Sequence, residues 1–143
     1  MEQRDFSKSF FFDIAKEKFE SVADRVTNRC SDPEERDWLI DLYGNMDISV
    51  LVDIPTMMVT YCRVPPNVTV APHKHNRNQI VMVVKGELHY GTKVIGPEMG
   101  YFGPDKFYSW TTGPEGCEFI EIMDGPVGLT TPSGKERQFQ KAS

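Results

Sequence analysis

The sequence places two of its three histidines one residue apart, as His73-Lys74-His75. In a β-strand, residues i and i+2 project from the same face, so both imidazoles reach one point while Lys74 faces the other way. Gln79 follows after a short polar turn and returns an amide oxygen to the same point. Two imidazoles and one oxygen suit Zn²⁺, Fe²⁺, Mn²⁺ or Ni²⁺. The alternative is a solvated turn with two incidental histidines, because surface histidines also pair by chance.

The rest of the sequence predicts the elements that position this group, beginning with helices. Residues 1–45 are predicted to be a helical segment that packs on the domain after it. Ser31 or Asp32 offers a capping side chain, Pro33 follows in the first turn, and this helix ends near Gly44-Asn45. An apolar stripe indicates a preceding helix and contains Ile14, Phe19, Val22, Ala23 and Val26.

Beyond residue 45 the pattern changes to short β-rich runs. Turn signals such as Lys85-Gly86 and Gly113-Pro114-Glu115-Gly116 separate the runs. The connections are too short for crossover helices, so the pattern predicts an antiparallel sandwich or barrel over residues 46–130. The polar residues 131–143 are predicted to form an edge strand or a disordered tail.

Residues 66–88 resemble the first motif of the cupin superfamily, which reads G-x5-H-x-H-x3/4-E-x6-G. His73, His75 and Gly86 stand at their motif positions, and Gln79 stands where glutamate is usual. The resemblance implies a mainly β fold, a single cupin barrel of the double-stranded β-helix or jelly-roll type, joined here to N-terminal helices. It also implies that His73, His75 and Gln79 bind a divalent metal, with iron, zinc, manganese and nickel as the candidates.

Residues 96–110 resemble the second cupin motif, G-x5-P-x-G-x2-H-x3-N, less closely. The histidine of that motif is absent, and Tyr108 or Ser109 falls at its place. We favour Tyr108, as a residue that orients a substrate or moves a proton. Phe102, Trp110 and Met82 are predicted to line a substrate pocket, and packing in the core is the alternative for these side chains.

The resemblance implies a metal-dependent small-molecule enzyme that acts on a carbonyl, enol or phenolic substrate, as a dioxygenase, an isomerase or cyclase, or a lyase. A neutral ligand set binds the metal less tightly than a set with glutamate, but it leaves the ion more positive. Two alternatives stay open. One is a non-catalytic cupin that senses a small molecule or a metal, and the other is a metal-free isomerase or epimerase with a histidine as base and Tyr108 as acid.

Composition indicates which partners and which cellular location to expect. The 143 residues carry a net charge of −5 without a cluster of Lys and Arg, so a nucleic-acid partner is not expected. No apolar stretch approaches the roughly 20 residues that span a bilayer, so no membrane association is expected. Three cysteines without CxxC spacing indicate reduced thiols and a cytoplasmic location. The resemblance also implies a homodimer.

Three further polar residues are candidates for the site: His89, Glu118 and Glu121. His89 alternates with Leu88 and Tyr90, so it is predicted to face solvent or a subunit contact instead of the metal. Glu118 and Glu121 lie on opposite faces of one predicted strand, so one of them could face the interior. Two solvated carboxylates are nevertheless expected, because glutamate is seldom buried without a partner.

Overall fold

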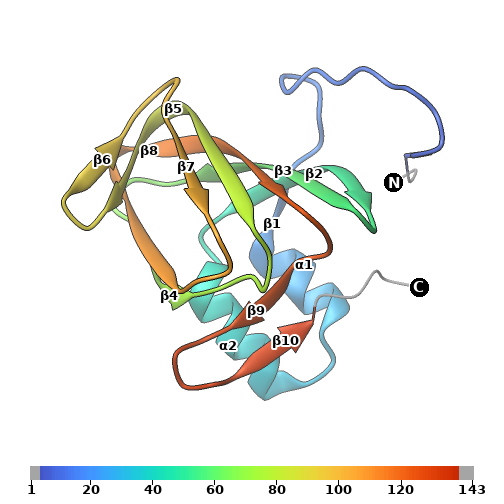
Figure 1. Ribbon diagram of the computed structural model, residues 1–143. Helices are drawn as coiled ribbons and strands as arrows, with labels where there is room; N and C mark the ends of the chain where they lie inside the picture. The colour runs from blue at the N-terminus through green and yellow to red at the C-terminus, as the bar shows by residue number, and fades with distance from the viewer. Residues whose placement is uncertain (1–3, 139–143) are drawn as a thin grey trace.

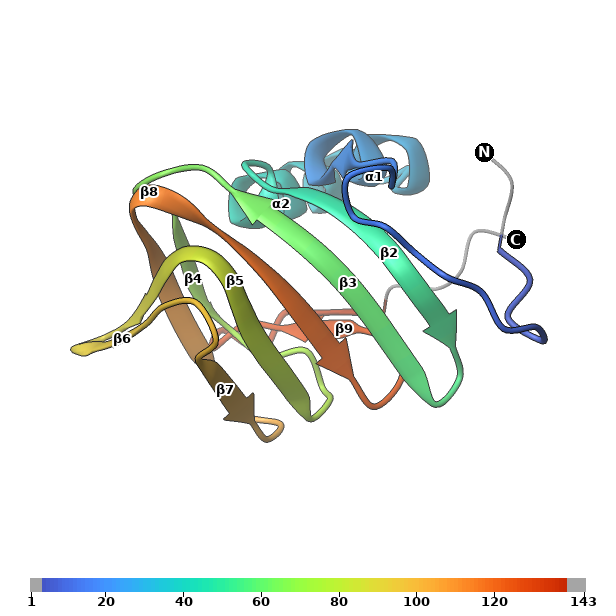
Figure 2. The ribbon, with the colours of Figure 1, turned by 90° about the horizontal axis from the view of Figure 1, so that it is seen from above.

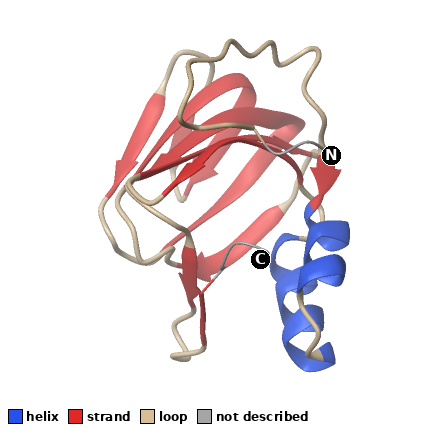
Figure 3. Ribbon diagram, turned by 90° about the vertical axis from the view of Figure 1, so that its right-hand side faces the viewer, coloured by secondary structure: helices blue, strands red, loops and turns tan. Residues whose placement is uncertain are grey.

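The chain forms a β-barrel of two curved sheets with helices at one end (Figures 1 and 3). The structure, a computed structural model, describes residues 4–138. Strands account for 47% of the described residues and helices for 14%, which confirms the predicted mainly β fold.

In chain order, the elements are β1 (Glu20–Ser21), α1 (Val22–Arg29), α2 (Pro33–Tyr43), β2 (Asp47–Ile54), β3 (Met57–Val64), β4 (Thr69–His73), β5 (Gln79–Tyr90), β6 (Lys93–Ile95), β7 (Gly100–Gly103), β8 (Tyr108–Met123), β9 (Gly128–Thr130) and β10 (Glu136–Gln138).

The two longest strands, β5 and β8, run through both sheets of the barrel. The first half of β5 and the second half of β8 lie beside β7 and β3 in one sheet. Their other halves lie beside β6 and β4 in the second sheet. All strand pairs among residues 4–138 are antiparallel, as the short connections predict. The core between the sheets includes Trp110 and Phe119, whose rings meet edge to face at 5.7 Å.

Glycines allow β5 and β8 to bend where they cross. Gly86 and Gly116 have φ angles of +73° and +79°, in the left-handed region that favours glycine. A Cβ atom on Gly86 would also meet the carbonyl oxygen of Gly116 far inside van der Waals contact. The prediction that these glycines belong to turns between separate strands is therefore wrong. They form corners within continuous strands, and Figure 2 shows the corner of β8.

The predicted helix before the barrel, α2, begins and ends as its sequence indicates. Oδ1 of Asp32 accepts hydrogen bonds from the backbone N–H groups of Glu34 and Glu35, and Gly44 caps the other end. Of the two residues predicted as the N-cap, Ser31 and Asp32, it is therefore Asp32 that caps the helix.

The prediction that the whole segment 1–45 is helical is wrong for its first part. Residues 4–19 form turns and extended chain, and α1 begins only at Val22, where the Ser21 hydroxyl accepts a hydrogen bond from the N–H of Asp24. Phe19 is predicted on the apolar face of a helix, but it precedes α1 and packs on the barrel. Its ring meets Tyr61 edge-on, and the guanidinium of Arg63 lies 3.8 Å from the centre of the ring. Residues 1–3 lie outside the described part of the chain.

At the other end of the chain, β10 pairs with β9 as a short hairpin below the barrel (Figure 1). Residues 136–138 thus form an edge strand, one of the two predicted alternatives, while residues 139–143 lie outside the described residues. Neither helix in the described chain has the length and apolar character needed to cross a membrane.

Candidate metal centre

The three residues proposed as metal ligands converge inside the barrel. His73 ends β4, His75 follows it by two residues, and Gln79 begins β5. Their side chains are buried, with exposed fractions of 1%, 7% and 3%. The two imidazole centres lie 5.0 Å apart, with the rings nearly perpendicular. The alternative of a solvated turn is therefore wrong.

Backbone carbonyls fix which nitrogen of each imidazole is free. Nδ1 of His73 bonds to the carbonyl oxygen of Ala71 at 2.6 Å, and Nδ1 of His75 bonds to that of Gly128 at 3.3 Å. A carbonyl oxygen only accepts, so Nδ1 carries the proton and Nε2 keeps its lone pair. Burial lowers the pKa of His73 to about 4 and that of His75 to about 3, so both rings are neutral at pH 7. Neutral imidazoles with a free Nε2 are the form that binds a metal.

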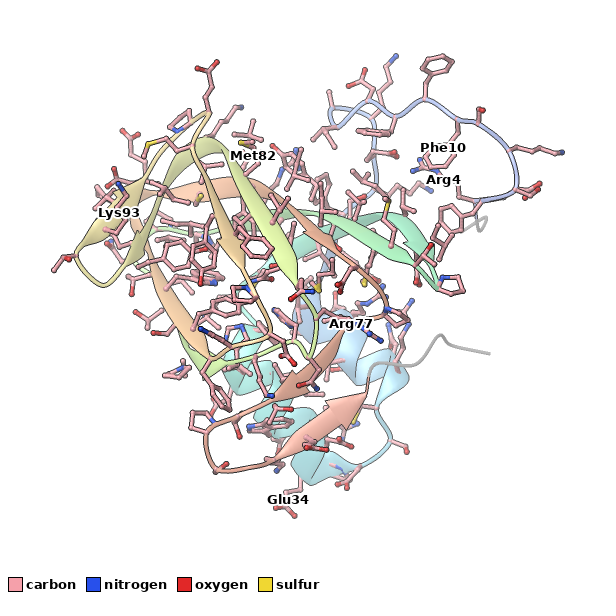
Figure 4. All side chains as sticks on the ribbon, viewed as in Figure 1. Arg4, Phe10, Glu34, Arg77, Met82 and Lys93 are labelled. Atoms are coloured by element: carbon pink, nitrogen blue, oxygen red, sulfur yellow. The ribbon has the colours of Figure 1, made fainter. Side chains whose placement is uncertain are left out.

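The turn between the histidines and Gln79 is held on several sides. Asn78 bonds through its backbone and its amide to the Asp124 carboxylate, and Nε of Arg77 donates to the carbonyl of Pro126 at 2.7 Å (Figure 4 labels Arg77). Asn76 has a φ of 60° and accepts a hydrogen bond from the Thr130 hydroxyl. These bonds fix where β5 begins, so they position Gln79 relative to the histidines.

Tyr108 stands beside the histidines, as predicted for the residue that replaces the motif histidine. Its backbone pairs with that of His73 across β4 and β8, and the two ring centres lie 4.6 Å apart. Its hydroxyl donates a hydrogen bond of 3.1 Å to Oε1 of Gln79. Burial raises the pKa of Tyr108 well above its ordinary value, so the phenol keeps its proton. Ser109, the alternative at this place, is exposed.

A second tyrosine, which the sequence analysis did not select, covers the imidazoles from the helical side. Tyr43 ends α2 and lies nearly parallel to His75, with interplanar angle 13° and ring centres 6.3 Å apart. It meets His73 edge-on at 5.4 Å. The sequence carried no signal for this contact, because the docking of α2 on the barrel depends on tertiary structure.

The donor set fits a metal in its chemistry. Both free Nε2 atoms belong to buried neutral imidazoles, and Nε2 of Gln79 is buried without a hydrogen-bond partner. An orphaned buried amide is unusual in a folded protein, and this N–H donor would face a water or substrate oxygen while the amide oxygen faces the metal. Among residues 4–138, no third histidine, cysteine or carboxylate joins the pair at ligand distance. Two imidazoles and the Gln79 oxygen would therefore leave further coordination positions to water or substrate.

The predicted substrate-pocket residues divide between the two sides of the barrel wall. Trp110 is inside, 5% exposed, and packs in the core. Phe102 and Met82 are 63% and 43% exposed on the outer face, so the prediction that they line the interior pocket is wrong (Figure 4 labels Met82). The alternation that turns Gln79 and Val81 inward necessarily turns Met82 outward.

Two other predictions about polar residues have opposite outcomes. His89 faces away from the site, where Nε2 lies 2.9 Å from the Glu87 carboxylate, as predicted. Glu118 also lies on the outer face and accepts a hydrogen bond from the Tyr61 hydroxyl. The expectation that Glu121 is solvated is wrong, because Glu121 shares the inward face of β8 with Phe119 and Met123.

No protein-family model and no curated protein matches this sequence, but solved structures do. An RmlC-like cupin from Shewanella frigidimarina is 16% identical with a TM-score of 0.60, over 82% of this chain and 92% of that chain. The polyketide cyclase RemF from Streptomyces resistomycificus is 22% identical with a TM-score of 0.53, over 69% and 74% of the two chains. An acetylacetone dioxygenase from Acinetobacter johnsonii is 16% identical with a TM-score of 0.54, over 64% and 67%.

These likenesses show the fold. The chain has the RmlC-like cupin fold, which confirms the fold implied by the motif around His73 and His75.

Proposed function

We propose that this protein is a metal-dependent small-molecule enzyme that acts on a carbonyl, enol or phenolic substrate. The observation that carries the proposal is the pair of buried imidazoles whose Nδ1 atoms are anchored to backbone carbonyls, so that both Nε2 atoms are free beside Gln79. Anchoring of this kind is how proteins orient metal-binding histidines.

Each residue of the site has a distinct task in this proposal. Nε2 of His73, Nε2 of His75 and the amide oxygen of Gln79 would hold the metal. When bound, a divalent ion there would supply Lewis acidity toward a substrate oxygen. Tyr108 keeps its proton and donates a hydrogen bond to Gln79, so its hydroxyl orients that amide, and donation to a substrate oxygen would replace this hydrogen bond. Tyr43 covers the imidazoles and excludes water from their helical side.

Two of the structural neighbours support this class of substrate. One is a polyketide cyclase and another is an acetylacetone dioxygenase, and both names describe compounds that contain carbonyl groups. The shared fold is compatible with three types of reaction. The first is oxygenation, the second is cyclisation or isomerisation, and the third is elimination. The proposed function is therefore defined by its substrate class, with these three reactions as alternatives.

The test is metal analysis of protein purified without a nickel column. We expect stoichiometric zinc, iron, manganese or nickel in the wild-type protein and loss of it in His73→Ala and His75→Ala. His89→Ala is the matched control, because His89 lies outside the site and is paired with Glu87. Equal metal content in all four proteins would refute the metal site.

A metal-free isomerase or epimerase is the second candidate. The absence of a third histidine, cysteine or carboxylate near the pair, within the described residues, favours it. In that case an imidazole Nε2 would act as base and the Tyr108 hydroxyl as acid. Turnover that persists after dialysis against a chelator would favour this candidate, and stoichiometric ligand binding without turnover would favour a non-catalytic sensor.

A further inference from the structure

The carboxylate of Glu121 faces the interior of the barrel and has no partner among residues 4–138. On β8, Glu121 lies between Phe119 and Met123 on the inward face, and it pairs across the sheet with Val81 of β5 and Thr60 of β3. Those four neighbours are 1% to 5% exposed, whereas Glu121 is only half-buried. Glu121 therefore projects into the barrel and keeps part of its surface accessible.

Four titratable groups interact electrostatically with Glu121: Tyr43 of α2, Cys62 of β3, Tyr90 of β5 and Tyr108 of β8. Burial is the main cause that raises the pKa of each, and the negative charge of Glu121 raises it further. The tyrosine rings are linked: Tyr90 stacks on Tyr101 at 4.6 Å, and Tyr101 lies 6.3 Å from Tyr108. Glu121 therefore projects to the same inside of the barrel as the imidazole pair, since Tyr43 and Tyr108 contact His73 and also interact with Glu121.

Folding alone does not explain this arrangement. Burial raises the pKa of Glu121 to about 7, and no hydrogen bond or cation among the described residues compensates for it. The hydroxyls of Tyr43 and Tyr90 are also buried without a partner. Each such group costs free energy that an apolar residue in its place would save. Strained or costly polar groups of this kind concentrate at sites of chemistry.

We propose that Glu121 is an acid–base residue of the interior site, and that the hydroxyls of Tyr43, Tyr90 and Tyr108 select a compact enolisable ketone that carries neighbouring oxygen atoms. The inference rests on the proposed function as a small-molecule enzyme and narrows its substrate class. It adds to the site a residue that touches the substrate.

The proton transfer is balanced within the site. The Glu121 carboxylate takes a proton from the carbon beside the substrate carbonyl, and the electron pair of that C–H bond moves into the carbonyl to form an enolate. A tyrosine hydroxyl donates a hydrogen bond to the enolate oxygen. After exchange with solvent, the protonated Glu121 returns a proton to the same carbon, where the new C–H bond restores the carbonyl, so no oxidant or reductant is needed.

The test follows deuterium exchange into dihydroxyacetone, whose carbon-bound protons exchange through an enediol. Proton NMR in D₂O at neutral pD measures the loss of the CH₂ signal with purified wild-type protein, Glu121→Gln and Glu118→Gln. We expect wild-type protein to accelerate the exchange and Glu121→Gln to lose about 100-fold or more of that rate. Glu118→Gln is the matched control from the outer face of the same strand, and it should exchange as the wild type does.

Outcomes of this experiment separate the inference from the proposed function. Glu121→Gln should keep the wild-type metal content, while His73→Ala loses it. Metal-free wild-type protein that still exchanges through Glu121 would refute the metal-dependent function alone. Wild-type exchange no faster than buffer, or equal rates in wild type and Glu121→Gln, would overturn the role of Glu121.

A second variant guards against loss of folding. Glu121→Asp keeps the carboxylate but withdraws it by one methylene, so we expect exchange at least about tenfold slower than in wild type. Its rate should still rise with pH through the carboxyl ionisation, whereas Glu121→Gln should show no such rise. A pH profile that is the same in wild type, Glu121→Asp and Glu121→Gln would overturn the proposal.

Discussion

The hydroxyl of Tyr108 donates a hydrogen bond to Oε1 of Gln79 at 3.1 Å, and so joins two of the residues at which this chain departs from the cupin motifs. A glutamate and a histidine are usual at these places. Here a neutral amide meets a neutral phenol, because burial keeps the Tyr108 proton in place. The two departures therefore compensate each other without a buried charge.

Restoring the glutamate should strengthen metal binding. In Gln79→Glu, a carboxylate replaces a neutral ligand, and attraction between opposite charges should lower the Kd for Zn²⁺ at least about tenfold. Gln79→Ala should raise the Kd, since a ligand is lost. Competition with a chromophoric chelator measures both values. A Gln79→Glu protein that binds Zn²⁺ no more tightly than wild type would show that residue 79 is not a ligand.

The inward-facing, half-buried Glu121 should make the protein less stable at alkaline pH. Its pKa is about 7 in the folded chain against an ordinary value of 4.5, so the folded state holds the proton that the unfolded state releases. The free energy of unfolding therefore falls as the pH rises from 4.5 to 7 and stays lower above that range. Glu121→Gln removes this loss and should be more stable than wild type by roughly 1–3 kcal/mol at pH 8.

Urea denaturation at pH 4 and at pH 8 checks this prediction. The gain of Glu121→Gln over wild type should be present at pH 8 and nearly absent at pH 4. Glu118→Gln should show no gain at pH 8, because its carboxylate is paired with Tyr61 and Arg63 on the outer face. The same difference between Glu121→Gln and wild type at both pH values would contradict the burial of this carboxylate.

A methyl group at the crossing of β5 and β8 should greatly lower the free energy of unfolding. Gly86→Ala places a Cβ atom against the backbone of Gly116 and also forces alanine into a positive φ, so we expect a loss of more than about 3 kcal/mol. Gly91→Ala is the control, since Gly91 also has a positive φ but no atom within 4 Å of its Cβ position. It should cost only about 1 kcal/mol. Equal unfolding midpoints for the two variants in urea would contradict the corner geometry.

An apolar row on the outer face supports the predicted homodimer. Phe102, Ile80 and Ile122 lie opposite one another on β7, β5 and β8, and they are 63%, 46% and 37% exposed. We expect a dimer in sedimentation at micromolar concentration, because exposed apolar rows of this kind are typical of interfaces. Phe102→Ser should shift it toward monomer, and Val94→Ser, an exposed residue on β6, should not. A monomeric wild-type protein would refute the dimer.

The sequence was sufficient for the parts of the site that depend on local geometry. The i, i+2 spacing of His73 and His75 on a strand fixes their common face, and the proline after Asp32 fixes the start of a helix. The first motif also predicted the fold, which the solved structures confirm. These features need only the backbone of a few neighbouring residues.

Other parts of the site depend on contacts between distant residues. Alternation from Gln79 already turns Met82 outward, so the strand pattern itself contradicts a place for Met82 in the interior pocket. Glu121 shares a face with Phe119, but the general preference of glutamate for water outweighed this pattern in the prediction. The corners at Gly86 and Gly116 and the contact of Tyr43 with His75 arise from strand crossing and helix docking, for which no local signal exists.

The stacking of Tyr43 on His75 also means that the strands of the barrel do not enclose the site by themselves. One side of the imidazole pair is supplied by the last residue of a helix, whose attachment to the barrel involves no shared strand hydrogen bonds. Displacing α2 would bring bulk water to the histidines while leaving every β-ladder intact. The access of water to the histidines thus depends on how α2 packs on the barrel. That packing can change without unfolding the sheets.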